Sequence, residues 1–264
     1  MKRFSILLLL LCTLCTLCAC KNLLGSNDDE DDNPFQGMSA QQLYTEGQEK
    51  LDKHLYSEAI KRFEALDNLY PFNDHAEQAN INLIYAYYQK EDYRSAAASA
   101  ERFIHLYPRS SSVDYAYYMK GLANFNQPRG ALASILPMNI AKRDPGTQAQ
   151  AYSDFATLVQ KFPNSPYKPN ALQRMIFLRN MFAQRELNAA YYYYDRRMYV
   201  AAEERASYYL KTYPQAPHAK EALAVVYYSD LALKLNDAAQ DALTVYQATY
   251  HSHPRKITNH TQEL

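Results

Sequence analysis

Cysteine is missing from most of this chain: Cys12, Cys15, Cys18 and Cys20 are its four cysteines, and all lie within the first 20 of 264 residues. A domain formed by the later residues cannot contain a disulfide, so an ordinary apolar core has to stabilise it. Such a domain also lacks a cysteine nucleophile and a redox-active cysteine pair.

Glycine is scarce, and neither sign of charge dominates. The six glycines are not spaced as in a phosphate-binding loop, and no GxSxG nucleophile motif is present. The 28 basic residues are balanced by 28 acidic residues, so no bulk basic field attracts nucleic acid. We therefore expect a protein that is not an enzyme and that binds neither a cofactor nor nucleic acid.

The longest apolar run lies at the N-terminus. MKRFSILLLLLCTLCTLCAC begins with two basic residues and continues with about a dozen apolar ones, which indicates a secretory signal, residues 1–19. The run is shorter than the roughly 20 residues of a membrane-spanning helix.

Leu17-Cys18-Ala19-Cys20 resembles a bacterial lipobox, which implies that Cys20 carries acyl chains and becomes the first mature residue. A plain signal peptide is the alternative. Lys21 follows; by resemblance to enterobacterial lipoproteins, in which Asp at this place causes retention in the inner membrane, the chain is expected to move to the outer membrane. Residues 20–38 are polar and acidic, which predicts a flexible tether after the lipidated cysteine.

From Ser39 onward the apolar residues recur at intervals of three and four, as in an amphipathic helix. No long stretch alternates with a period of two. The sequence therefore predicts an all-α domain.

Four prolines that follow an aromatic residue divide this domain into repeats. Counting back 24, 15, 12, 8 and 5 positions from a proline gives matching small, aromatic and apolar residues. The sets are Gly47, Tyr56, Ala59, Phe63 and Leu66 before Pro71; Ile84, Tyr93, Ala96, Ala100 and Phe103 before Pro108; and Ala190, Tyr199, Ala202, Ala206 and Tyr209 before Pro214. This is the 34-residue tetratricopeptide pattern, in which proline ends the second helix of each pair. We expect a tetratricopeptide-type α-solenoid of about five helix pairs.

The third repeat is interrupted. Its first helix, residues 114–125 with Gly121 at the small position, is separated from its second helix, which precedes Pro163, by a loop insertion at 127–147. We expect N-terminal helix pairs at 39–126, C-terminal helix pairs at 148–250, and a disordered tail at 251–264. An extended helix is predicted from Pro166 or Pro169 to about Arg197. His251, His253 and His260 suggest a metal site, but they lack zinc spacing and nearby carboxylates, so no metal is expected.

Tyrosine is abundant, with 25 residues against no tryptophan. Most tyrosines are expected to fill gaps between helices. In this repeat class the first helix of each pair lines the groove, where aromatic and amide side chains suit an extended peptide. The predicted groove residues are Tyr44, Gln48, Ile81, Tyr85, Tyr88, Tyr115, Tyr118 and Phe125.

Four consecutive tyrosines, 191–194, precede Asp195, Arg196 and Arg197. Such a run covers all faces of a helix, so one or two of its rings are exposed unless something covers them. The two arginines favour the end of a helix through its dipole, and a docked partner domain is the functional alternative.

The lipobox, the tether and residues 39–72, 86–125, 153–167 and 193–214 together resemble the BamD family of the β-barrel assembly machine, BAM. The resemblance covers nearly the whole mature chain. It implies a lipid-anchored scaffold on the periplasmic face of the outer membrane, which helps to assemble and insert β-barrel proteins.

The resemblance also implies partners. The C-terminal half would bind the periplasmic domains of BamA through Tyr194, Asp195, Arg196 and Arg197. The N-terminal half would receive the aromatic C-terminal segments of unfolded β-barrel proteins, and other BAM lipoproteins would bind as well. An adaptor for peptidoglycan enzymes or envelope-division proteins is the alternative function.

Overall fold

The computed structural model describes residues 34–127 and 146–257. Within these ranges the chain forms ten α-helices and no strand, which confirms the all-α prediction. The helices are α2 (Ala40–Asp52), α3 (Tyr56–Leu69), α4 (Ala76–Gln89), α5 (Tyr93–Leu106), α6 (Val113–Asn126), α7 (Gly146–Lys161), α8 (Lys168–Asp195), α9 (Tyr199–Thr212), α10 (Ala219–Ala232) and α11 (Asn236–Tyr250).

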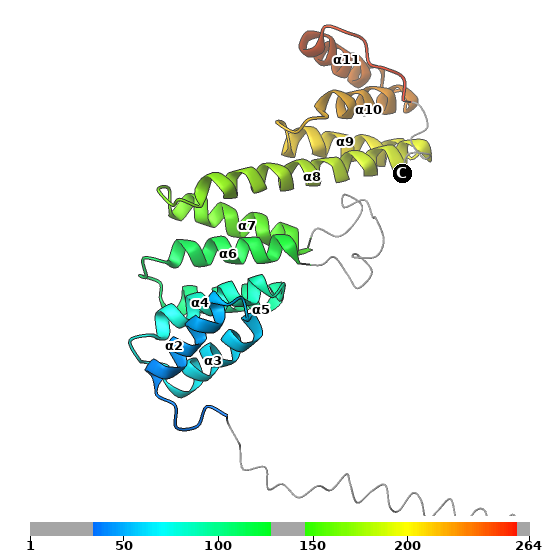
Figure 1. Cartoon of the computed structure of the whole chain (residues 1–264). Helices are drawn as coiled ribbons and strands as arrows, with labels where there is room; N and C mark the ends of the chain where they lie inside the picture. Colours follow the sequence, from blue (N-terminus) through cyan, green and yellow to red (C-terminus); the bar gives the residue numbers. More distant parts are fainter. Residues whose placement is uncertain (1–33, 128–145, 258–264) are drawn as a thin grey trace, which may run out of the picture.

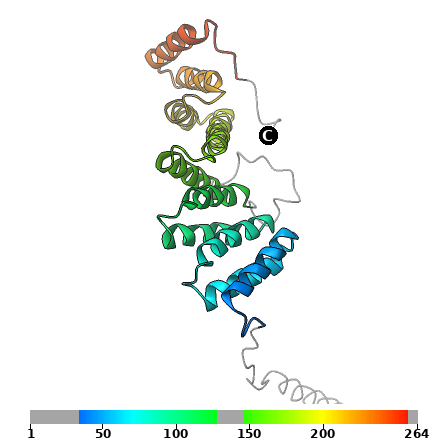
Figure 2. The same cartoon turned by 60° about the vertical axis from the view of Figure 1, so that its left-hand side comes forward.

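The helices form five antiparallel pairs that stack in one direction (Figure 1). Each helix packs on the next one along the chain, and the first helices of neighbouring pairs also meet, α2 with α4, α4 with α6 and α8 with α10. A second view shows the same order of pairs from the blue to the red end of an elongated stack (Figure 2). This is the predicted solenoid of tetratricopeptide type.

A left-handed residue closes the turn inside four of the pairs. Its φ is +56° at His54, +63° at Glu91, +59° at Arg197 and +61° at Lys234. In each case the amide of the following residue donates to a carbonyl five residues earlier, as Leu55 N does to Lys50 O at 2.8 Å. This hydrogen bond ends the first helix in a Schellman-type turn. The third pair has the 127–147 region instead.

The prolines lie where the repeat pattern predicts. Helices α3, α5, α7 and α9 each end at the residue directly before the aromatic–proline pair, at Pro71, Pro108, Pro163 and Pro214. Proline cannot donate the next backbone hydrogen bond and restricts the residue before it, so the second helix of each pair stops there.

Small residues allow the two helices of a pair to approach closely. A Cβ on Gly47 would lie 2.7 Å from the Phe63 ring, and a Cβ on Gly121 would lie 2.5 Å from the Phe155 ring. Both distances are far below van der Waals contact, so only glycine fits beside these rings. The Gly121–Phe155 contact also shows that α6 and α7 form one pair across the 127–147 region.

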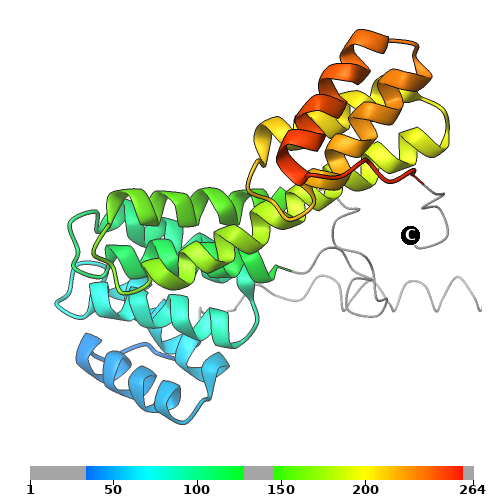
Figure 3. The same ribbon diagram turned by 90° about the horizontal axis from the view of Figure 1, so that it is seen from above.

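The long helix α8 joins two parts of the core, as its 28 residues allow (Figure 3). Ala171 and Leu178 pack with α4–α7, whereas Ala183, Leu187 and Ala190 pack with α9–α11. The predicted extended helix from Pro166 or Pro169 is confirmed by α8.

The C-terminal end differs from the prediction of a disordered tail at 251–264. His251 adopts a left-handed conformation, φ +48°, and turns the chain back toward α10. Pro254 is buried, the Tyr228 hydroxyl donates to its carbonyl at 2.9 Å, and Ile257 packs on the core. Residues 251–257 therefore belong to the folded domain. The prediction was wrong there because the contacts that hold this segment come from α10, distant in sequence.

Other predictions lie outside the described residues: the signal 1–19, the lipidated Cys20, most of the 20–38 tether and the 127–147 insertion, and residues 258–264. Within the described parts of the chain, no helix combines the length and the hydropathy that a membrane span requires.

Candidate functional site

The eight predicted groove residues lie on the first helices of the first three pairs, and all are half-buried. We call them, with four residues of α8 described below, the aromatic strip. Contacts of α4 with α2 and α6 place these three helices side by side. Each side chain therefore has one part packed against its neighbours and another part at the surface, which is what a binding surface requires.

At the N-terminal end of the strip, Tyr44 stacks on His75 with ring centroids 4.6 Å apart and planes at 12°. Gln48 accepts a hydrogen bond from Asn82 Nδ2 at 2.8 Å, which links α2 to α4. Because the Gln48 carbonyl oxygen is held by Asn82, the amide orientation is set before any ligand arrives.

In the centre of the strip, tyrosines of α4 and α6 lie close together. The Tyr88 hydroxyl accepts a hydrogen bond from Asn126 Nδ2 at 2.7 Å. Burial raises the pKa of Tyr115, and the neighbouring Tyr167 and Tyr85 raise it further. Tyr115 therefore remains a neutral phenol at physiological pH, so its hydroxyl can donate a hydrogen bond.

The strip continues onto α8, which the sequence prediction missed. The Tyr118 ring stacks on Tyr167 at 4.7 Å, and its hydroxyl donates to Asn170 Oδ1 at 2.9 Å. Arg174 also donates to Asn170 Oδ1, at 2.8 Å, and its guanidinium carbon lies 4.8 Å from the centroid of the Phe125 ring. The four added residues of the strip are Tyr167, Asn170, Arg174 and Phe177.

Phe177 extends the apolar part of this end. Its ring centroid lies 5.7 Å from that of Phe125, and the residue is 49% exposed. Residues 167, 170, 174 and 177 are spaced by three and four, so they share one face of α8. That spacing is a signal in the sequence, but the side of α8 that faces α6 depends on the packing of distant segments.

A hollow of about 390 Å³ opens beside the strip. Its lining includes three strip residues, Ile81, Tyr115 and Tyr167, and Asp114 is the only charged group among the residues that line it. Its volume falls within the range of about 300–1,000 Å³ for ligand pockets. The hollow therefore has room for a large side chain of a bound segment.

The other predicted site lies at the turn between α8 and α9. Arg196 is exposed, and its guanidinium carbon lies 3.6 Å from the centroid of the Tyr192 ring. Tyr194 meets Tyr199 edge to face at 5.4 Å. Asp195 Oδ2 is buried without a hydrogen-bond partner in the described part of the chain.

Arg197 has a second role at this turn, because its positive φ closes the hairpin. The next residue, Met198, is 50% exposed, and Val200 is 57% exposed. The turn thus presents two arginines beside apolar side chains, a combination that is typical of protein–protein interfaces.

Metal chemistry has no support in the described residues, where no group of three His, Cys, Asp or Glu side chains could hold an ion. Of the three histidines considered, His251 and His253 are exposed near the end of the described chain, and His260 lies outside it. The fold and the aromatic strip define an α-solenoid of tetratricopeptide type, a class whose stacked repeats present extended surfaces for binding.

The comparisons with known proteins narrow this class. The family model YfiO, described as "Outer membrane lipoprotein", matches residues 36–245. A protein of Neisseria gonorrhoeae is 36% identical over 212 residues, which cover 80% of this chain and 78% of that protein. A protein of Vibrio cholerae is 37% identical over 199 residues, 75% of this chain and 83% of that protein. Both are named "Outer membrane protein assembly factor BamD".

A third relative, from Haemophilus influenzae, has the same name and is 33% identical over 210 residues, 80% of each chain. The chain belongs to this BamD (YfiO) family of outer membrane lipoproteins. The matched residues include the aromatic strip and the α8–α9 turn.

Proposed function

We propose that this protein is a non-enzymatic scaffold of the BAM complex, which assembles β-barrel proteins and inserts them into the outer membrane. Membership of the BamD family and the name of its relatives support this function. The observation that carries the proposal is the aromatic strip, which continues over the first helices of four successive pairs.

The strip binds the aromatic C-terminal segments of unfolded β-barrel proteins. Its tyrosines offer large contact areas with few rotatable bonds, so little side-chain entropy is lost when a segment binds. The amides of Gln48 and Asn170 and the tyrosine hydroxyls hydrogen-bond the backbone of an extended segment. The hollow beside Ile81 and Tyr115 takes one aromatic side chain.

The α8–α9 turn docks on the periplasmic domains of BamA. Arg196 is exposed and already oriented by its contact with the Tyr192 ring, and it can therefore form a charge-assisted hydrogen bond at low entropic cost. Other BAM lipoproteins bind elsewhere on the solenoid. Acyl chains on Cys20 anchor the protein to the periplasmic face of the outer membrane.

Site-specific photocrosslinking tests client binding. A photoreactive residue at position 85 should crosslink to a peptide with the aromatic C-terminal segment of a β-barrel protein. The matched control is position 208, because Tyr208 is exposed on α9, a second helix outside the strip. Equal yields at the two positions would contradict binding by the strip.

Co-purification with BamA tests the docking site. Arg196→Ala should weaken binding about tenfold, equivalent to about 1.4 kcal/mol, because arginines are frequent interface hot spots. Lys211→Ala removes an exposed cation from the last turn of α9 and should leave binding unchanged. Equal binding by both variants would argue against docking of BamA at the α8–α9 turn. Normal levels of outer-membrane β-barrel proteins in cells that lack this protein would favour the alternative function, an adaptor.

A further inference from the structure

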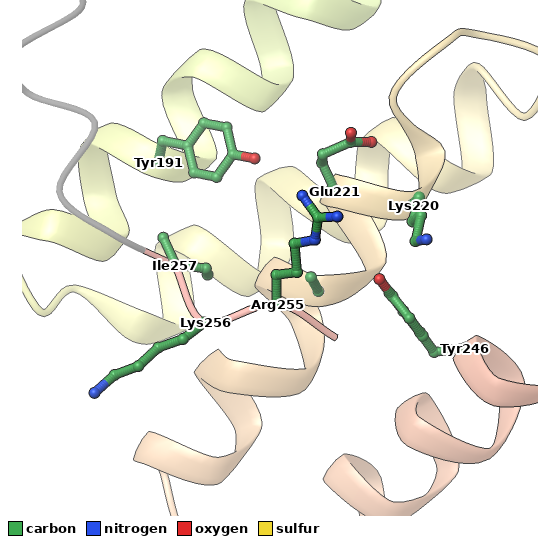
Figure 4. A pocket seen from close by; sticks show the side chains of 8 residues that line it. Tyr191, Lys220, Glu221, Tyr246, Arg255, Lys256 and Ile257 are labelled. Carbon is green, nitrogen blue, oxygen red and sulfur yellow. The ribbon is translucent and has the colours of Figure 1, made fainter. Parts of the chain in front are cut away.

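A second polar pocket lies at the C-terminal end, apart from the aromatic strip and from Arg196. Its volume is about 430 Å³, and it opens between α8, α10, α11 and the segment that follows α11 (Figure 4). We call it the C-terminal pocket. The lining residues are Tyr191, Lys220, Glu221, Ala224, Tyr246, Arg255, Lys256 and Ile257.

The wall that carries Arg255 is held in place on both sides. The carbonyl of Pro254 accepts the Tyr228 hydroxyl at 2.9 Å, and Ile257 packs against the core. Since the residues before and after Arg255 are fixed, its backbone is held beside α10 without a ligand, and only the side chain has to be ordered on binding.

Cations outnumber carboxylates in the C-terminal pocket. Lys220, Arg255 and Lys256 line it, whereas Glu221 is its one carboxylate. Within the described ranges, Arg255 has no ion-pair partner at 4.0 Å or less. Figure 4 shows the Arg255 guanidinium on the same side as the Tyr191 hydroxyl and the Glu221 carboxylate, while the Lys256 side chain points away from them.

Aromatic groups complete the lining. Lys220 Nζ lies 5.8 Å from the centroid of the Tyr246 ring, close enough for a cation–π contact. Burial, followed by the Glu221 charge, raises the pKa of Tyr191 to about 12. Burial also raises the pKa of Tyr246. Both hydroxyls therefore remain protonated and can donate hydrogen bonds.

We propose that the C-terminal pocket binds a carboxylate of a peptide segment from a partner protein. The planar fork of Arg255 matches the two oxygens of a carboxylate, and Lys220 supplies a second positive charge. Glu221 accepts a backbone N–H of the same segment. A doubly charged phosphate is disfavoured because Glu221 repels it, whereas a carboxylate beside an amide uses both signs of charge.

This inference is independent of the proposed function, because it requires neither the strip nor the docking turn. The carboxylate has two sources, the C-terminus of a segment or an acidic side chain, which offer the same chemistry. The test distinguishes them with capped tripeptides of alanine: one with a free C-terminus, one amidated with a central aspartate, and one amidated with a central asparagine.

Binding of these peptides to the full chain is measured by NMR from the side-chain signals of Arg255 and Lys220. The two peptides with a carboxylate should bind, the tighter one showing the source, and the asparagine peptide should not. Arg255→Gln and Lys220→Gln should each weaken binding about tenfold, the loss of one charge-assisted hydrogen bond. Thermal unfolding shows whether each variant is folded.

Lys211→Gln is the control, because it removes an exposed cation of the same half, in the last turn of α9, that does not line the pocket. Equal losses for Arg255→Gln and Lys211→Gln would show diffuse electrostatics and overturn the proposal. Tighter binding of inorganic phosphate than of either carboxylate peptide would overturn it as well, and Glu221→Gln should improve phosphate binding. A gain in peptide binding after truncation at Ile257 would show that the chain's own end occupies the pocket, which also contradicts a partner.

Discussion

In the N-terminal half of the solenoid, α2–α7, the buried carboxylates lie against cations, whereas in the C-terminal half, α8–α11, a buried carboxylate lies beside another carboxylate. Asp67 pairs with Arg102 and accepts from Asn80 Nδ2 at 3.0 Å. Asp154 lies 3.2 Å from Lys120 Nζ and accepts from Asn124 Nδ2 at 2.7 Å.

Asp230 of α10 is only 5% exposed, and it has no ion pair within the described ranges. Burial raises the pKa of Asp230, and the negative charge of the Glu203 carboxylate raises it further. Two other buried oxygens in this half, Asp195 Oδ2 and Ser229 Oγ, lack hydrogen-bond partners among the described residues. The unsatisfied polar groups therefore gather in the half that carries the proposed docking turn and the C-terminal pocket.

The difference teaches how each half is held together. Ion pairs connect neighbouring helix pairs in the N-terminal half. Arg102 of α5 pairs with Asp67 of α3, and Lys120 of α6 pairs with Glu101 of α5. Removing one member of such an ion pair is strongly destabilising, because the other member is left as a buried charge without a partner. The C-terminal half relies on alanine-rich apolar packing and tolerates uncompensated polar groups, as functional regions often do.

Removing the central cation of the N-terminal network should have the largest effect. Lys120→Met leaves the buried Asp154 and the neighbouring Glu101 without their shared cation, so the free energy of unfolding should fall by about 3–5 kcal/mol. Urea unfolding measures the change. Lys211→Met, at an exposed position of the C-terminal half, should change it by less than about 0.5 kcal/mol. Similar losses in both variants would show that the network is not what distinguishes the halves.

Filling the small position of the third pair comes next. Gly121→Val places a side chain against the Phe155 ring, and the overpacking should cost about 2 kcal/mol, within the usual range of 1–3 kcal/mol. Gly146→Val is the control, because a Cβ there meets nothing within 4 Å. At the equivalent place in the C-terminal half Ala190 already has a buried Cβ, so Ala190→Gly should cost about 1–2 kcal/mol through lower helix propensity and the loss of a buried methyl group. If the Gly121→Val variant were as stable as the parent protein, the close approach of α6 to the Phe155 ring would be contradicted.

A smaller effect is expected at a buried aromatic position that differs between the halves. Phe103 and Tyr209 occupy the same repeat position, and the Tyr209 hydroxyl accepts the His218 N–H at 2.9 Å. Tyr209→Phe should cost about 1 kcal/mol because the amide loses its acceptor. Tyr208→Phe, on the exposed face of α9, should cost almost nothing in the same thermal unfolding experiment. A larger loss of stability from Tyr208→Phe than from Tyr209→Phe would contradict a stabilising role for the hydrogen bond from His218 N to the Tyr209 hydroxyl.

The smallest effect should have the opposite sign. The raised pKa of Asp230 means that its ionised form destabilises the folded state, so Asp230→Asn should raise Tm at pH 7. The gain should shrink as pH falls through the folded pKa and vanish below the ordinary Asp value of about 3.9, where Asp230 is protonated in both states. Asp154→Asn should lower Tm at pH 7, since it removes the partner of Lys120. A gain for Asp230→Asn that persists at pH 3 would rule out ionisation as the cause.

Much of the fold could be predicted because its signals are local. The helix ends at Pro71 and Pro214 follow from the missing amide hydrogen of proline, and Gly47 and Gly121 mark the close contacts of their own hairpins. The position of the eight groove residues on the first helices of the repeats could be predicted from the repeat pattern, and their role in binding stays a prediction. The α8 part of the strip was missed, since its neighbours Tyr118 and Phe125 lie about 50 residues earlier in the chain.

The sequence by itself determined the class of the molecule: periodic apolar residues and regularly placed prolines specify helical hairpins, because helix formation and termination depend on neighbours within a few residues. Tertiary structure alone decided which side of α8 meets the strip, how residues 251–257 fold back on α10, and which buried carboxylates find a cation. Those outcomes depend on packing between segments far apart in the chain, where small differences in helix orientation choose the partners.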